Sequence, residues 1–226
     1  DIDKLMERTK RRPLVTGVLS PRSALIFAIS IEILAFIWLW AFVNLLSAFL
    51  AVAACLFYVF VYSLWLKRSS TSNIVIGGAA GAVPVLIGWS SVTNSLDWPP
   101  VILFLLIFLW TPPHFWALAI RYREDYSNAN VPMLPVIEGT KVTGYRMVLY
   151  AFQVWAISLI FVPVADMGLI YLISAILLGA IFTFFSFQVM IRPTQKSAMR
   201  LFGFSISYIT ILFTLIAVDQ LVRSGF

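Results

Sequence analysis

The sequence predicts an all-α fold, a polytopic bundle of seven transmembrane helices that forms one domain over residues 1–226. Hydrophobic residues make up 61% of the chain and charged residues only 12%, about half of the charged fraction of a typical soluble domain. Seven apolar runs are long enough to cross a hydrocarbon core, which takes roughly 20 helical residues. Basic residues recur in every second loop, as a chain that crosses a bilayer back and forth requires.

The seven apolar runs follow one another with mostly short connections. They lie at residues 23–42, 46–65, 74–92, 100–120, 144–164, 168–190 and 202–222. These spans leave almost no room for a soluble domain. The single cysteine, Cys55, falls within the second run, so the sequence excludes an internal disulfide. The chain opens on Asp1 without an initiator methionine, and we expect a truncated N-terminus.

The positions of the basic residues predict the orientation of the chain. Fifteen of the sixteen lysines and arginines precede the first run or follow the second, fourth and sixth runs. The loops around Asn44, Asp97 and Asp166 carry none. The positive-inside rule therefore places the N-terminus on the cytoplasmic side of a cell membrane, or on the matrix side of a mitochondrial inner membrane. This pattern explains the net charge of +6 without nucleic acid, which we do not expect as a partner.

Two of the basic loops also carry acids and prolines, in "DIDKLMERTKRRPLVTG" and "RYREDYSNANVPMLPVIEGTK". If the fourth run continues as a helix, Arg121, Glu124 and Asp125 at i, i+3 and i+4 share one face. Mg²⁺ is commonly held by one or two carboxylates together with substrate phosphates, and basic residues neutralise the remaining phosphate charge. Such loops above an apolar cavity suit a magnesium-bound diphosphate with a long apolar tail. The alternative is a solvated, charge-balanced loop.

Four segments resemble one known family in their order along the chain. They are "DIDKLMERTKRRPL", "KRSSTSNIVIGGAAGAVPVLIGW", "WTPPHFWAL" and "DYSNANVPMLPVIEG". The set resembles the UbiA superfamily of intramembrane prenyltransferases and, within it, the protohaem IX farnesyltransferases. The resemblance runs from Asp1 to about Thr143, and the last three runs fit mainly by hydropathy. It implies a bundle of nine helices of which this chain lacks the first two, and a first motif N-x3-D-x3-D that ends at Asp3.

The resemblance implies roles for the polar residues of these segments. Asp3 matches a metal-ligating aspartate, while Asp125 with Glu124 stands where the superfamily usually has a fuller aspartate motif. Lys67 and Arg68 match a pair that meets the diphosphate, so the predicted catalytic set is Asp3, Asp125, Lys67 and Arg68. The further predicted substrate contacts are Arg8, Arg12, Arg121, Arg123, His114 and Tyr122. The alternatives are interface anchors for the basic residues and a hydrogen-bonded core residue for His114, in place of an axial or propionate contact with haem.

Two further features inside the spans admit more than one interpretation. Gly77 and Gly81 form a small-x-x-x-small pattern that favours close helix packing, and the alternative is space for a bulky substrate. Glu32 lies in the middle of the first run, where an ionisable residue is by default a functional hypothesis.

The resemblance implies a Mg²⁺-dependent transfer of farnesyl from farnesyl diphosphate to the 2-vinyl group of haem B, with water addition, to give haem O and diphosphate. The implied partners are both substrates and the lipid bilayer, with haem A synthase and terminal oxidase assembly proteins as candidates. The alternatives are a quinone-type or chlorophyll-type acceptor, or a transporter or assembly factor without catalysis. A transporter should place acids or broken helices near the bilayer centre, whereas six of the ten acids here lie on the basic side.

Overall fold

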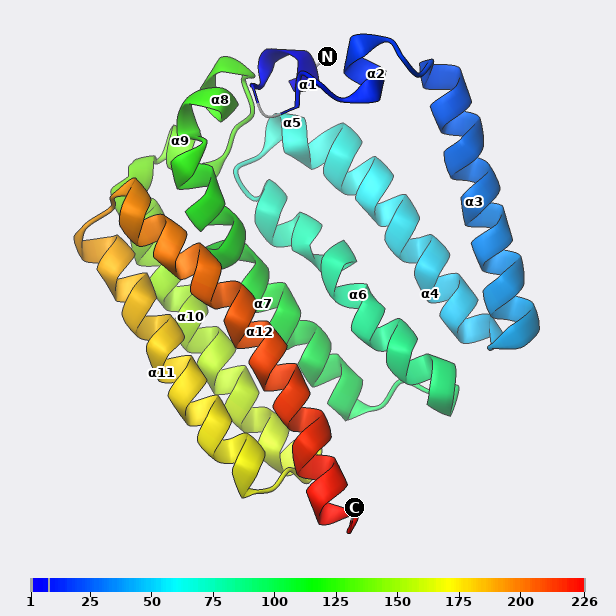
Figure 1. Cartoon of the computed structure of the whole chain (residues 1–226), viewed down its shortest axis with the longest axis vertical. Coiled ribbons are helices and arrows are strands. Elements are labelled where there is room, and N and C mark those ends of the chain that lie inside the picture. The colour runs from blue at the N-terminus through cyan, green and yellow to red at the C-terminus, as the bar shows by residue number, and fades with distance from the viewer. Residues whose placement is uncertain (1, 8, 226) are drawn as a thin grey trace.

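The computed structural model describes residues 2–7 and 9–225, and in this part of the chain it contains helices and no strands (Figure 1). The predicted seven membrane-spanning helices are all present. They are α3 (Pro21–Phe42), α4 (Leu45–Leu56) continued by η1 (Phe57–Leu66) and α5 (Lys67–Ser69), α6 (Asn73–Thr93), α7 (Trp98–Arg121), α10 (Gly139–Val164), α11 (Leu169–Ile191) and α12 (Gln195–Arg223). The prediction of an all-α polytopic membrane fold is confirmed.

Short helices gather at the end of the molecule where the basic loops lie, which we call the basic end (Figure 1). They are α1 (Ile2–Leu5), α2 (Pro13–Thr16), α8 (Arg123–Asn128) and α9 (Leu134–Ile137). The C-terminus lies at the other end (Figure 1). Both acid-bearing segments predicted from the sequence therefore lie at one end of the bundle.

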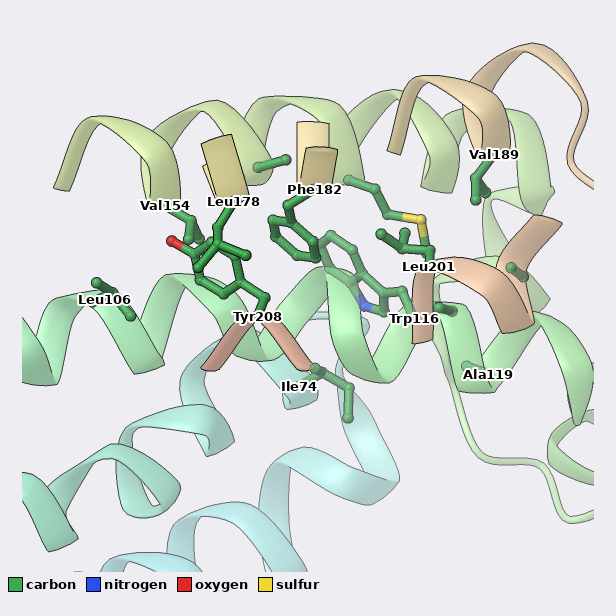
Figure 2. Close-up of a cluster of buried hydrophobic side chains, with 14 of the residues drawn as sticks. Ile74, Leu106, Trp116, Ala119, Val154, Leu178, Phe182, Val189, Leu201 and Tyr208 are labelled. Atoms are coloured by element: carbon green, nitrogen blue, oxygen red, sulfur yellow. The ribbon is translucent and has the colours of Figure 1, made fainter. Parts of the chain in front are cut away.

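Helices α7, α10, α11 and α12 pack together and form the main core. Helix α7 contacts α10 and α12, and α11 contacts the same two helices. Figure 2 shows the large side chains of Trp116, Phe182 and Tyr208, from three of these helices, pointing toward one another, and all three are fully buried. Helix α6 packs on α7, α4 on α6 and α3 on α4. Helices α6, α4 and α3 thus follow one another outward from the four-helix core. Their exposed apolar side chains suit a lipid environment.

Two helices begin five or more residues earlier than the hydropathy pattern predicted. Helix α10 starts at Gly139 instead of 144, and α12 starts at Gln195 instead of 202. At α12 the Thr194 hydroxyl accepts a hydrogen bond from the Ser197 amide at 3.1 Å. The Ser197 hydroxyl in turn accepts one from the Thr194 amide at 3.1 Å, and the two bonds form a capping box. Hydropathy marks where side chains are apolar, whereas hydrogen bonds and caps decide where the helix begins.

The second span changes its helical pitch before it reaches the basic end. Residues Phe57–Leu66 form a π-helix, and the Lys67 amide donates to the carbonyl of Tyr62, five residues earlier. π-Helical turns are rare and often accompany functional sites. Here the widened segment leads directly into Lys67 and Arg68. No hydropathy signal in the sequence distinguishes this segment from an ordinary α-helix.

A buried carboxylate of α12 accepts hydrogen bonds from the beginning of α11, at the end opposite the basic loops. The Asp219 side chain, only 1% exposed, accepts hydrogen bonds from the amides of Gly168 at 2.6 Å and Tyr171 at 3.1 Å. These amides belong to the beginning of α11, where backbone N–H groups lack partners within the helix. Asp219 therefore caps α11 from a different helix and fixes how the last two spans meet.

Candidate active site

The N-terminal polar segment folds back on itself and holds Asp3 in place. Arg12 Nη1 donates to Asp3 Oδ2 at 2.7 Å, and Thr9 Oγ1 donates to the Asp3 carbonyl at 2.9 Å. Met6, only 3% exposed, anchors the segment in the hydrophobic core. An acid and an arginine of the first acidic segment thus form an ion pair. Arg8, also predicted to contact substrate, lies outside the described residues.

Asp3, Lys67 and Arg68 line a single cavity of about 700 Å³, which we call the Asp3 cavity. Its walls come from α1 and α2, from the beginning of α3 and from the junction of η1 with α5. Arg12 forms an ion pair with Asp3 and so adds positive charge next to the cavity. The structure thus brings together three of the four residues that were predicted as catalytic.

The second acidic segment does not continue α7 as one helix. Helix α7 ends at Arg121, Tyr122 leaves the helical conformation with φ −102° and ψ 28°, and α8 begins at Arg123. The condition under which Arg121, Glu124 and Asp125 would share one helical face, a continuation of the fourth span, is therefore not met. Arg121, Arg123 and Glu124 nevertheless line one cavity of about 600 Å³, the Arg121 cavity. The Arg121 guanidinium lies 5.5 Å from the centre of the Tyr122 ring, within the range of a cation–π contact.

Asp125 lines neither of these two cavities. It lies half-buried in the first turn of α8. Among residues 2–7 and 9–225, no three histidine, cysteine or acidic side chains converge on a point that could hold a metal ion. The chain's own atoms therefore do not gather Asp3, Glu124 and Asp125 into one cluster. Carboxylate oxygens are nonetheless the donors that Mg²⁺ prefers, and one or two of them suffice when phosphate oxygens complete the shell.

An apolar cavity of about 490 Å³ lies between the second span, α6 and α7. It extends from the middle of these spans toward the basic end. Its aromatic walls are Tyr58, Tyr62, Trp110 and Phe115. Cys55 also lines it, and this thiol interacts with Glu32 of α3. The one acid in the middle of a span thus lies close to the cavity without lining it.

Both interpretations of the glycine pattern find support in α6. A Cβ at Gly77 would collide with the ring of Tyr62, and one at Gly78 would come within 2.9 Å of the Thr111 side chain, so these glycines allow close packing. A Cβ at Gly81 would meet nothing within 4 Å, and Gly81 lines the apolar cavity. The pattern therefore combines close contacts near the basic end with open space one turn further along α6.

His114 lies between α7 and α12 and does not line the apolar cavity. Its ring stacks on Trp110 and Phe202, at centroid distances of 4.3 and 4.6 Å. Its Nδ1 lies 2.7 Å from Ser205 Oγ, and that hydroxyl lies 2.6 Å from the Phe202 carbonyl. Both hydrogen bonds form together only when Nδ1 carries the proton, because a carbonyl cannot donate. In that tautomer Nε2 keeps a lone pair.

The sequence interpretation gave no role to Tyr62 or Asn73. Tyr62 lines the apolar cavity, and its ring lies against Gly77 of α6. Asn73 connects α6 to the segment between α8 and α9. Asn73, 1% exposed, donates from Nδ2 to the Pro132 carbonyl at 3.4 Å, and its Oδ1 has no partner among the described residues. The available signal was a polar residue that opens a span five positions after the lysine-arginine pair.

The sequence matches the UbiA prenyltransferase family over residues 1–211. Proteins named Protoheme IX farnesyltransferase are 50% identical in Clavibacter michiganensis subsp. michiganensis and 52% identical in Parafrankia sp. strain EAN1pec, each over 224 residues. The alignments cover 98% of this chain, with 73% of the Clavibacter protein and 72% of the Parafrankia protein. A similar protein from Paenarthrobacter aurescens is 50% identical over 230 residues, which cover all of this chain and 72% of the relative.

A solved structure of digeranylgeranylglyceryl phosphate synthase in membranes superimposes on the chain with a TM-score of 0.77. The match covers 96% of this chain and 78% of the other, at 20% sequence identity. At this identity the likeness concerns the fold.

Proposed function

The chain belongs to the UbiA prenyltransferase family, and from this premise we propose that it farnesylates protohaem IX. In the proposed reaction, farnesyl diphosphate and haem B combine with water to give haem O and diphosphate. The names of relatives that are 50–52% identical support haem as the acceptor. One structural observation carries the proposal: a cavity lined by Asp3, Lys67 and Arg68 lies at the basic end, and an apolar cavity extends from the middle of the spans toward that end.

The Asp3 cavity suits the diphosphate head of the donor. Lys67 and Arg68 supply positive charge for the phosphate oxygens. Asp3 offers a hard oxygen ligand for Mg²⁺, and Asp125 on the neighbouring acidic segment is the proposed second ligand. Bound Mg²⁺ would withdraw electron density from the leaving diphosphate. The basic side chains stabilise the same negative charge as it develops.

The apolar cavity suits the farnesyl chain and a face of the porphyrin. Its lining is mostly hydrocarbon, so binding an apolar substrate there removes water from both surfaces. The rings of Tyr58, Tyr62 and Trp110 present electron-rich faces to an allylic cation. Excluding bulk water also prevents early quenching of that cation.

The proposed bond changes form one sequence. The C–O bond between farnesyl C1 and the diphosphate breaks, and the diphosphate leaves with the electron pair. The terminal carbon of the haem 2-vinyl group bonds to C1, which leaves a cation next to the porphyrin. Water adds to that cation and releases one proton, for which the departing diphosphate is a suitable acceptor. The product carries a hydroxyethylfarnesyl arm.

His114 and the arginines of the Arg121 cavity complete the proposed substrate contacts. Any contact between His114 and haem requires Nε2, because Ser205 engages Nδ1. Arg121 and Arg123 supply two cations for haem propionates or phosphate. The apolar product would remain in the bilayer, where haem A synthase and oxidase assembly proteins are proposed partners.

The test is an assay of the protein in its membrane with haem B, farnesyl diphosphate and Mg²⁺. Mass spectrometry should detect haem O, and chelation of Mg²⁺ should abolish it. A parallel reaction with an aromatic quinone precursor in place of haem B should give no prenylated product. Prenylation of the quinone precursor without haem O would support the quinone-type alternative. Absence of any prenylated product would leave only a non-catalytic role.

A further inference from the structure

We infer that a hollow between α11 and α12 at the basic end binds the phosphate headgroup of an anionic phospholipid. The hollow measures about 530 Å³, and we call it the α11–α12 hollow. Its lining includes Gln188, Ile191, Arg192, Thr194, Lys196 and Arg200. It shares no lining residue with the Asp3, Arg121 and apolar cavities, so the inference does not depend on the proposed function.

The charge of the α11–α12 hollow is not neutralised by the protein. Arg192, Lys196 and Arg200 form no side-chain hydrogen bond or ion pair within the part of the chain that the structure describes. Other basic residues do have carboxylate partners, as Arg12 has Asp3 and Arg146 has Glu138. Three cations around one concave surface favour an anion with several oxygens.

The hydroxyl groups in the hollow are already engaged. Thr194 and Ser197 bond to each other in the capping box, and Ser197 also donates toward the Arg192 carbonyl at 2.6 Å. The Ser197 amide at the beginning of α12 donates to Thr194 Oγ1, so this N–H group is also engaged. The anion is therefore bound by the three cationic side chains. They recognise the phosphate group and do not select the rest of the headgroup.

The surroundings of the hollow favour a lipid over a soluble anion. Ile191 at its edge is 70% exposed. One α-helical face continues from Gln188 through Phe184 and Ile181, which are 57% and 41% exposed. On the facing helix, a Cβ at Gly203 would meet nothing within 4 Å. An apolar track thus leads from the cationic hollow along the spans, where acyl chains lie beneath a headgroup.

The test compares two charge variants of the intact protein in detergent by native mass spectrometry. R192Q/K196Q/R200Q removes the three cations of the hollow, and R11Q/R22Q/K141Q removes three exposed cations elsewhere at the basic end. Phosphatidylglycerol should bind the unaltered protein and the control variant equally. It should bind the hollow variant roughly a hundredfold more weakly, because each basic residue near an anionic lipid surface contributes a factor of about five.

A second pair of variants tests the acyl track without changing charge. Gly203→Phe should weaken binding of phosphatidylglycerol by roughly tenfold, whereas Gly88→Phe, another helical glycine with open space around it, should not. Thermal unfolding of each variant verifies that it is folded. Equal binding to the hollow variant and its control would overturn the site. Equal binding of phosphatidylcholine, or of glycerol phosphate without acyl chains, would overturn the assignment to an anionic lipid.

Discussion

Asp3 is the residue on which the proposed chemistry depends most. Its carboxylate lies at the wall of a cavity that also presents Lys67 and Arg68, and only Arg12 forms an ion pair with it among the described residues. An exposed pair of this kind contributes little to stability. The role that we propose for Asp3 is ligand binding.

Replacing Asp3 by asparagine should lower haem O formation by roughly a hundredfold, since an oxygen that stabilises the departing diphosphate through the metal loses its charge. The protein should remain folded. Initial rates at several Mg²⁺ concentrations measure the effect, because a lost metal ligand should also raise the Mg²⁺ requirement. Asp97→Asn, at the opposite end of the bundle, serves as the control. Full activity of Asp3→Asn would remove Asp3 from the site.

Asp219 illustrates a polar residue whose role is structural. Asp219→Asn should destabilise the protein by about 2 kcal/mol, because a buried carboxylate that accepts two amide hydrogen bonds is replaced by a neutral amide. Thermal unfolding in detergent measures the change. Asp166→Asn removes a carboxylate that is 92% exposed and pairs with Arg223, and should change stability by less than about 1 kcal/mol. Equal effects of both substitutions would contradict the capping role.

At the scale of elements, hydropathy predicted the spans and local hydrogen bonding set their ends. The predicted run 100–120 and the helix Trp98–Arg121 nearly coincide, because both ends of that span are apolar up to the loop. The early start of α12 arises from the Thr194 cap, and the break after α7 from the conformation of Tyr122. The π-helix of the second span left no hydropathy signal, because it depends on backbone hydrogen bonds.

The open side of α6 leads to a prediction about substrate size. Gly81→Leu should lower kcat/KM for farnesyl diphosphate by roughly tenfold or more, because the new side chain occupies the apolar cavity. Gly88→Leu, seven residues further along the same helix, gains the same helix propensity outside the cavity and should leave the reaction unchanged. Steady-state rates with farnesyl and geranyl diphosphate measure this. The shorter donor should suffer less, and equal losses for both donors would contradict the assignment of the cavity.

At the scale of the whole molecule, the charge pattern and the fold agree. The segments that carry fifteen of the sixteen basic residues lie at one end of the helices, although they are distributed along the whole sequence (Figure 1). Motif order indicated which loops matter, but not which residues would share a cavity. The structure unites Asp3 with Lys67 and Arg68, and it groups Arg121 with Glu124 in another cavity. Such groupings depend on helix packing, which no spacing along the chain encodes.

The basic end should face the cytoplasm, or the matrix in a mitochondrion, by the positive-inside rule. In a Cys55→Ala background, a membrane-impermeant maleimide should label Ser95→Cys in intact cells and Ser127→Cys only after lysis. These serines lie near the two opposite ends of the spans. The reverse labelling pattern would invert the predicted orientation.

The central claim is that the diphosphate head and the farnesyl chain of one donor occupy the Asp3 cavity and the apolar cavity together. Photolabelling with farnesyl diphosphate that carries a diazirine at its distal end, followed by peptide mass spectrometry, tests this claim directly. The predicted result is labelling of the apolar cavity at Tyr58, Gly81 or Trp110, competed by unlabelled farnesyl diphosphate and lost when Lys67 and Arg68 are both replaced by glutamine. Competed labelling confined to α11, or labelling of the cavity that persists without the two cations, would contradict it.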